Sequence, residues 1–324
     1  MERSKHNPSE ALLQKRVSPA AAGIVLLAMA ALLCAWNFAA AAWGFSLPLW
    51  ASSVFEIAVF LIPAVLLLLL SGAKTPAATP LGARRTLLVI GMGLTGYLFT
   101  VSLTAGWSLL WTYLTGGGAS TALAETVLDE PLWLLLVVIA LTPAICEELF
   151  FRGILMTSLA YDPAGAVCLS AALFALMHFD MTKLFPTFAL GLFIGWVVLR
   201  TGNLKAGMLL HFINNAISVC YIKAAGALSS MDPDAITNAL VSDPALAVQT
   251  SVAGIAAMLL VVLGVPLFVL FLVLFLRDTK RDADRLREEA YALCEHHRGA
   301  AVFLISIAVA MFAAALLFSG VLSL

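Results

Sequence analysis

Nine apolar stretches, separated by short polar segments, limit most strongly how this chain of 324 residues can fold. A helix needs about 20 mostly apolar residues to cross the hydrocarbon of a bilayer. Of all residues, 62% are hydrophobic and only 11% carry a charge. The pattern predicts an all-α protein, a polytopic bundle of about eight or nine transmembrane helices. The predicted helices cover residues 20–43, 50–71, 86–114, 131–158, 164–180, 184–200, 206–223, 251–276 and 300–322.

The basic residues between these stretches fall mostly on one side of the predicted membrane. With nine spans, fifteen Lys and Arg residues lie on the side of the N-terminus, and only Lys183 and Lys223 lie on the other. Because cytoplasmic loops carry the excess of Lys and Arg, the split predicts a cytoplasmic N-terminus. The short loops favour a bacterial plasma membrane. The charged segment 277–299 is expected to be a solvated cytoplasmic helix, with binding to lipid headgroups as the alternative.

One cluster of charges interrupts the most apolar part of the chain. The run from Leu132 to Ile145 has no charged residue, and Glu147, Glu148 and Arg152 follow soon after it. A charge inside a membrane segment costs several kcal/mol unless it is paired or faces water, so such residues commonly mark function. On a helix, Glu148 and Arg152 lie one turn apart and can form an ion pair. Glu147 points about 100° away from Glu148 and is expected to serve another task.

Two further polar clusters lie on the apolar helices that follow. Phe174 and His178 are four residues apart, and so are His211 and Asn215. Each pair therefore projects from one face of its helix, and the ring of Phe174 can pack beneath the imidazole of His178. Together with Glu147, these side chains are the parts of a hydrolytic site.

The predicted helix limits place parts of this site at different depths. Glu147 lies about 11 residues before the inner end of its helix, and His178 lies near the outer end of the next helix. At ~1.5 Å per residue, roughly 15 Å of depth separates them, too much for shared chemistry. Either the fifth predicted helix continues past Asp180, or the fourth ends earlier, near Phe151.

Two other residues of the apolar helices bear on the site. Pro143 removes the helical hydrogen-bond partner of the carbonyl of Ile139, which predicts a kink near Glu147. Glu56 stands alone in the second predicted helix and belongs to no motif. For Glu56, bonding across helices, a position near the membrane interface and a functional role are all open.

The three clusters resemble, in order and spacing, the motifs of the CAAX-processing and bacteriocin-processing (CPBP, or Abi) intramembrane proteases. The resemblance covers about 90 residues, from Pro131 to Lys223, and implies a protease with a four-helix catalytic core at 131–223. The motifs are Glu147-Glu148-x-x-x-Arg152, Phe174-x-x-x-His178 and His211-x-x-x-Asn215. The other expected parts are a cytoplasmic tail at 1–19 and transmembrane helices at 20–130 and 224–324, the latter including the charged segment 277–299.

The resemblance implies a catalytic role for four residues. Glu147 matches the glutamate that activates a water, and His178 matches the residue that helps to hold this water. His211 and Asn215 match the pair proposed to stabilise the oxyanion of the tetrahedral intermediate. These residue types suit the tasks, because a carboxylate can act as base and then as acid, and imidazole and carboxamide groups can donate hydrogen bonds to developing negative charge.

Two questions about the site are open at this stage. Glu148 and Arg152 match a supporting pair of the family, and they equally fit a structural ion pair at a cytoplasmic helix end. Members of the family are often called metalloproteases. Glu147, His178 and His211 could bind zinc or another divalent metal, so metal dependence is open as well.

Functions of other classes are also open. Buried carboxylates and histidines build proton relays in carriers, although no internal repeat and no second broken helix in a matching position indicates a transporter. A non-catalytic scaffold or bacteriocin-immunity protein on the same fold is the third interpretation. The expected partners of a protease are a peptide or lipidated-peptide substrate and the lipid bilayer, and nothing in the sequence indicates a nucleic-acid partner.

Overall fold

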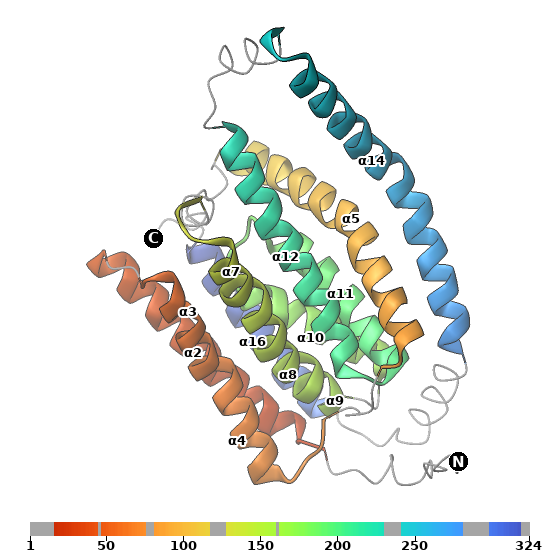
Figure 1. Cartoon of the computed structure of the whole chain (residues 1–324). Helices are drawn as coiled ribbons and strands as arrows, with labels where there is room; N and C mark the ends of the chain where they lie inside the picture. Colours follow the sequence, from red (N-terminus) through yellow and green to blue (C-terminus); the bar gives the residue numbers. More distant parts are fainter. Residues whose placement is uncertain are drawn as a thin grey trace. The chain divides into compact units, whose positions relative to one another are not determined.

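The described part of the chain is entirely helical, as the apolar stretches predict, and forms no strand (Figure 1). Six of its helices are long and apolar enough to cross a membrane, and two shorter apolar helices accompany them. The fold class is therefore a polytopic helical membrane protein. The computed structural model describes residues 16–44, 47–75, 81–116, 128–159, 162–229, 241–280 and 298–318. Most of the tail 1–19 and of the segment 277–299 lies outside these ranges.

The helices form two compact units, neither of which is continuous in the sequence. One unit comprises Met1–Leu81, Thr142–Met208 and Thr279–Leu324, and the other comprises Gly82–Leu141 and Leu209–Asp278. The first unit holds α2 (Pro19–Trp43), α3 (Leu49–Glu56), η1 (Ile57–Leu61), α4 (Ile62–Ser71), α8 (Thr142–Phe150), η3 (Phe151–Leu155), α9 (Met156–Ser158), α10 (Pro163–Leu176), α11 (Leu184–Thr201) and α16 (Arg298–Phe318). The second holds α5 (Ala83–Thr115), α7 (Leu132–Leu135), η2 (Leu136–Leu141), most of α12 (Leu204–Ser229) and α14 (Pro244–Asp278).

Local sequence signals set several helix ends. Ser18 accepts a hydrogen bond from a backbone N–H of the first turn of α2, and Asp162 does the same for α10. In both helices a proline occupies the first position, Pro19 or Pro163, where its missing N–H costs nothing. Gly72, with a φ of +64°, ends α4 in the left-handed conformation typical of helix C-termini.

The largest shortening relative to the predicted limits concerns the helix expected at 164–180. Here α10 has only 14 residues and ends at Leu176, four residues early. Phe179 has a φ of +48°, a left-handed conformation that cannot continue the helix. Asp180 then accepts hydrogen bonds from the backbone and the hydroxyl of Thr182, which starts a tight turn instead.

The sequence suggested two changes of helix limits that would bring Glu147 and His178 to one depth, and both are wrong. The fifth helix does not continue past Asp180, and the fourth does not end near Phe151 but runs on through η3 to Ser158. The helix at 206–223 is also longer than expected, because α12 reaches Ser229.

Two π-helical turns directly precede prolines, where the regular hydrogen-bond ladder must fail. η1 lies just before Pro63 and closes with a bond from the N–H of Ile62 to the carbonyl of Ile57. η2 lies just before Pro143, where a kink was expected. Because proline lacks the N–H that an α-helix needs, the wider turn is a local way to accommodate it.

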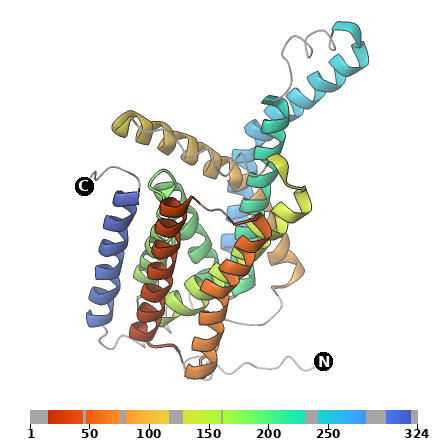
Figure 2. The same cartoon turned by 90° about the vertical axis from the view of Figure 1, so that its left-hand side faces the viewer.

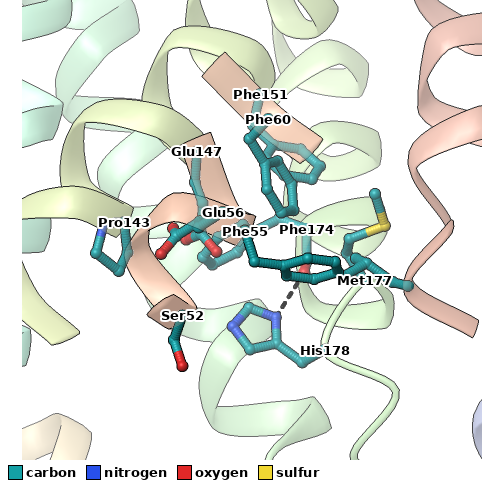
Figure 3. Close-up of a pocket in the computed structure, with 11 residues that line it drawn as sticks. Ser52, Phe55, Glu56, Phe60, Pro143, Glu147, Phe151, Phe174, Met177 and His178 are labelled. Atoms are coloured by element: carbon teal, nitrogen blue, oxygen red, sulfur yellow. Dashed lines mark hydrogen bonds between the residues drawn. The ribbon is translucent and has the colours of Figure 1, made fainter. Parts of the chain in front are cut away.

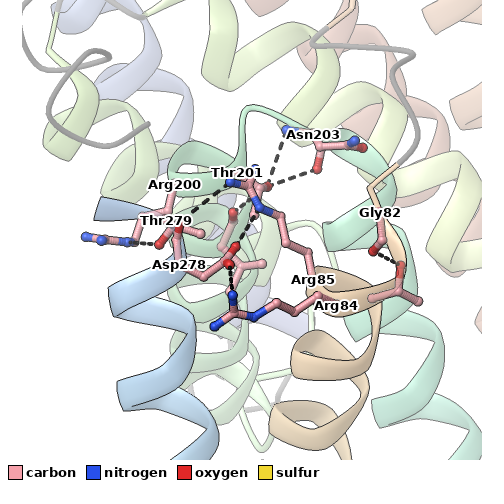
Figure 4. A network of polar contacts seen from close by, with 10 residues as sticks. Gly82, Arg84, Arg85, Arg200, Thr201, Asn203, Asp278 and Thr279 are labelled. Carbon is pink, nitrogen blue, oxygen red and sulfur yellow. Dashed lines mark hydrogen bonds and ion pairs between the residues drawn. The ribbon is translucent and has the colours of Figure 1, made fainter. Parts of the chain in front are cut away.

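Each unit is tied together by its own contacts. In the first unit α2 and α16 pack side by side (Figures 1 and 2), and Arg200 at the end of α11 donates to the hydroxyl of Thr279 at 3.0 Å. In the second unit α5 packs along α14 (Figure 1), and Arg85 donates to the carboxylate of Asp278 at 2.8 Å (Figure 4).

Candidate active site

The acidic pair of the first motif lies inside the helix that runs from Leu132 to Ser158. Arg152 Nη1 donates to Glu148 Oε1 at 2.7 Å, and both side chains are 0% exposed. The ion pair predicted from the four-residue spacing is therefore present. It lies in the core of the first unit, and the helix continues beyond it, so it does not mark a helix end.

Arg152 connects three helices of the first unit. Its Nη2 donates to the carbonyl of Gly191 on α11 at 3.1 Å, and its guanidinium lies 4.5 Å from the ring centre of Phe174 on α10. A buried charge is tolerated only with such partners. α10 and α11 approach closely here, since a Cβ at Gly191 would lie 3.1 Å from the Cβ of Ala171. The arginine therefore fixes the helix of Glu147 against α10 and α11.

The other partner of the ion pair lies against a glycine of α12. A Cβ added at Gly207 would lie 2.5 Å from Cγ2 of Val198 and 3.2 Å from Oε2 of Glu148. Only a residue without a side chain lets the backbone of α12 approach Glu148 so closely. Gly207 thus belongs to the support of the acidic pair, although no motif marks it.

A pocket of about 250 Å³ opens beside this pair and brings Glu147 and His178 together (Figure 3). Its polar lining consists of these two residues with Ser52 and Glu56 from α3. Its apolar lining consists of Leu33, Phe55, Phe60, Pro143, Phe151, Phe174 and Met177. The expected depth difference of roughly 15 Å is therefore wrong. Glu147 lies 11 residues before Ser158 and His178 lies 15 residues after Pro163, so at 1.5 Å per residue their depths differ by only about 6 Å.

The hydrogen bond of His178 determines how its ring is used. Nδ1 lies 3.0 Å from the carbonyl oxygen of Phe174 (Figure 3), and because a carbonyl can only accept, Nδ1 carries the hydrogen. In the neutral ring Nε2 is then an acceptor. The ring of Phe174 contacts the imidazole edge to face, with centroids 5.1 Å apart. The contact between these two rings was expected from their spacing.

The third motif lies in the second unit, on α12. His211 is 3% exposed, and Asn215 follows one turn later on the same helix. Asn215 Nδ2 donates to the carbonyl of Ile139 at 3.1 Å, which is the carbonyl that Pro143 deprives of its helical partner. Asn214 in turn donates to Oδ1 of Asn215 at 3.2 Å. These bonds orient the carboxamide and engage one of its two N–H groups.

The residues considered as metal ligands, Glu147, His178 and His211, come from both units. Within the described ranges, no group of three His, Cys, Asp or Glu side chains is placed to hold a metal ion.

Glu56 and Asn214 occupy none of the positions that define the three sequence motifs. The helical spacing of Ser52, Phe55 and Glu56 shows that the three share one face of α3, and this face lines the pocket. Nothing in the sequence shows which helix that face meets.

These features define the class of the protein, a membrane protein that is helical throughout its described part, with a buried ion pair and a mainly apolar pocket that holds two carboxylates and a histidine. Residues 129–217 match the family model of the Rce1-like type II CAAX prenyl endopeptidases. The chain therefore carries a domain of the CAAX protease family, and the matched segment includes all three motifs. This family consists of proteases, so the match supports a peptidase of the CAAX-type intramembrane class. No curated protein and no solved structure matches the chain.

Proposed function

We propose that the protein is an intramembrane endopeptidase that hydrolyses a peptide bond of a peptide or lipidated peptide with a water activated by Glu147. The observation that carries this proposal is the shared pocket of Glu147 and His178 inside a segment that matches a peptidase family. A carrier or a non-catalytic scaffold has no comparable support, because residues 129–217 match a family of proteases.

The water is held by two acceptors in this mechanism. One of its hydrogens points to the carboxylate of Glu147 and the other to Nε2 of His178, whose Nδ1–H is engaged by Phe174. The oxygen lone pair is then directed at the substrate carbonyl carbon. Glu147 takes the proton as the C–O bond forms, and returns it to the leaving nitrogen as the C–N bond breaks.

The negative charge on the carbonyl oxygen needs hydrogen-bond donors. His211 and Asn215 are proposed for this task, on the strength of their motif and of their places one turn apart on α12. The carboxamide of Asn215 has a second N–H besides the one bonded to Ile139. Donors fixed in place before the reaction stabilise such a charge most effectively.

The ion pair below the pocket is proposed to support this chemistry rather than to take part in it. Glu148 and Arg152 hold the helix that carries Glu147 against α10 and α11. The excess of basic residues on one side supports a cytoplasmic N-terminus, and the short loops support a bacterial plasma membrane.

An activity assay on purified protein in detergent tests this function. We expect wild type to cleave members of a panel of fluorogenic peptides, with and without a lipid group. Glu147→Gln should lower kcat about 10²–10⁴-fold, the usual contribution of a positioned base. The matched control is Cys146→Ala, which changes the adjacent buried residue and should keep most of the activity. Full activity of Glu147→Gln would disprove the mechanism.

The same assay addresses metal dependence. Activity that survives dialysis against a strong chelator would assign the reaction to side chains of the chain alone. Loss of activity that only added zinc restores would show that a metal takes part.

A further inference from the structure

Glu56 is a half-buried polar residue of the pocket that the mechanism above leaves without a role. It ends α3, and its carboxyl group turns into the pocket that Glu147 and His178 also line (Figure 3). Its Oε1 atom is buried, and it accepts no hydrogen bond from any described residue. Burial of a carboxylate oxygen without a donor is unfavourable, so a purely structural position would favour an apolar residue like its neighbours.

The backbone around Glu56 is held in place relative to Glu147. The hydroxyls of Ser53 and Thr142 lie 3.3 Å apart and join α3 to the start of α8. Ser53 is one turn before Glu56, and Thr142 lies five residues before Glu147. The wide turn η1 begins directly after Glu56, and such turns recur at functional sites.

The donors in the pocket can be counted from the proposed reaction. The two hydrogens of the water are used by Glu147 and by Nε2 of His178. The hydroxyl of Ser52 is the other donor of the pocket lining, and it does not reach Oε1 of Glu56, which has no described partner. The peptide substrate brings a donor at the reacting centre, the N–H of the scissile bond.

We propose that Glu56 binds the scissile N–H of the substrate, and then the amine that this nitrogen becomes. This inference rests on the proposed function. With its N–H held by Glu56, the nitrogen turns its lone pair to the proton that Glu147 carries. One C–O bond forms, the C–N bond breaks, and the water proton passes by way of Glu147 to nitrogen. Glu56 accepts a hydrogen bond throughout and exchanges no proton in this sequence.

A matched pair of substrates tests this role on the purified full chain. One is a peptide that wild type cleaves, and the other is its depsipeptide, in which an ester oxygen replaces the scissile N–H. Glu56→Leu should lower kcat/KM for the amide about tenfold, the upper end of what loss of one hydrogen bond costs. Its kcat/KM for the ester should stay close to the wild-type value, because the ester has no N–H to bind.

Two further variants make the outcome unambiguous. Glu56→Gln keeps an acceptor oxygen and should fall between wild type and Glu56→Leu on the amide. Ser52→Ala changes the same face of α3 and should leave the amide-to-ester ratio unchanged. Retained ester cleavage shows that each variant is folded.

The inference fails if Glu56→Leu loses amide and ester cleavage equally, or if it cleaves the amide like wild type. Both results leave the proposed function intact as long as Glu147→Gln is inactive. Cleavage by Glu147→Gln, in contrast, contradicts the proposed function itself, whatever Glu56 does.

Discussion

The two units of the protein bury polar groups of different kinds. The first unit encloses a full ion pair, Glu148 with Arg152, beside a pocket with two further carboxylates. Among the described residues of the second unit, the buried polar side chains are His211 and Asn214. Burial of a charge is far more costly than burial of an amide, so the first unit bears the larger cost, next to the residue proposed as the base. The second unit carries the residues proposed as hydrogen-bond donors to the oxyanion.

Breaking the ion pair should have the largest effect on stability. Arg152→Met leaves the carboxylate of Glu148 buried without its cation, and we expect it to cost about 3–5 kcal/mol of unfolding free energy. Thermal and denaturant unfolding of the purified protein in detergent measures the loss. The double variant Glu148→Leu with Arg152→Met should recover much of it, because no lone charge remains. If the single variant were as stable as wild type, the pair would not be holding the first unit together.

The proposed oxyanion donors of the second unit should matter for activity more than for stability. Asn215→Ala removes one proposed oxyanion donor and should lower kcat about 10²–10³-fold. Its unfolding free energy should fall by only about 1 kcal/mol, the value of its bond to Ile139. In a Pro143→Ala background that carbonyl regains a backbone donor, so the stability effect of Asn215→Ala should shrink. Equal and large losses of stability in both backgrounds would make Asn215 structural.

A methyl group at Gly207 should disturb the packing of the first unit around its ion pair without removing any charge. Gly207→Ala places a Cβ 2.5 Å from Val198 and close to Glu148, and we expect a destabilisation of about 1–3 kcal/mol from overpacking. Gly106→Ala on α5 is the matched control, because its Cβ would meet nothing within 4 Å. The control should be neutral or slightly stabilising, measured by the same unfolding curves. A neutral Gly207→Ala would mean that α12 can move away from Glu148.

The smallest expected effect concerns the turn after α10. Burial alone would raise the pKa of Asp180, but hydrogen bonds from Thr182 and the charge of Lys183 outweigh it and lower this pKa below its ordinary value. A lowered pKa in the folded state contributes stability above the unfolded pKa, near 4, and this contribution is lost as the pH falls through the folded value. Asp180→Asn should therefore lower the melting temperature slightly at pH 7 but not at pH 3. A difference that persists unchanged at pH 3 would contradict this account.

Local patterns predicted local geometry well. The pairing of Glu148 with Arg152 and the contact of Phe174 with His178 follow from spacing on one helix, and both are present. The apolar stretches likewise predicted most helices to within a few residues, because an uninterrupted apolar run has few alternatives in a membrane.

Contacts between helices could not be predicted in this way. The bonds of Arg152 to Gly191 and of Asn215 to Ile139 join residues 39 and 76 positions apart. Periodicity shows which residues share a face, as for Glu56 on α3, but not which face it meets. The early end of α10 depends on the left-handed conformation of Phe179, a residue type that rarely adopts it and so gives no warning.

The short α10 has a consequence for how water reaches a reaction inside a bilayer. Its 14 residues extend over about 21 Å at 1.5 Å per residue, less than the ~30 Å of a hydrocarbon layer. The turn behind it carries the exposed His178 and an ion pair between Asp180 and Lys183. Lipid tails cannot solvate such groups, so we expect the bilayer to thin or to admit solvent at this point. Water is the second substrate of the proposed hydrolysis, and we expect it to enter at this turn, next to the residue proposed to hold it.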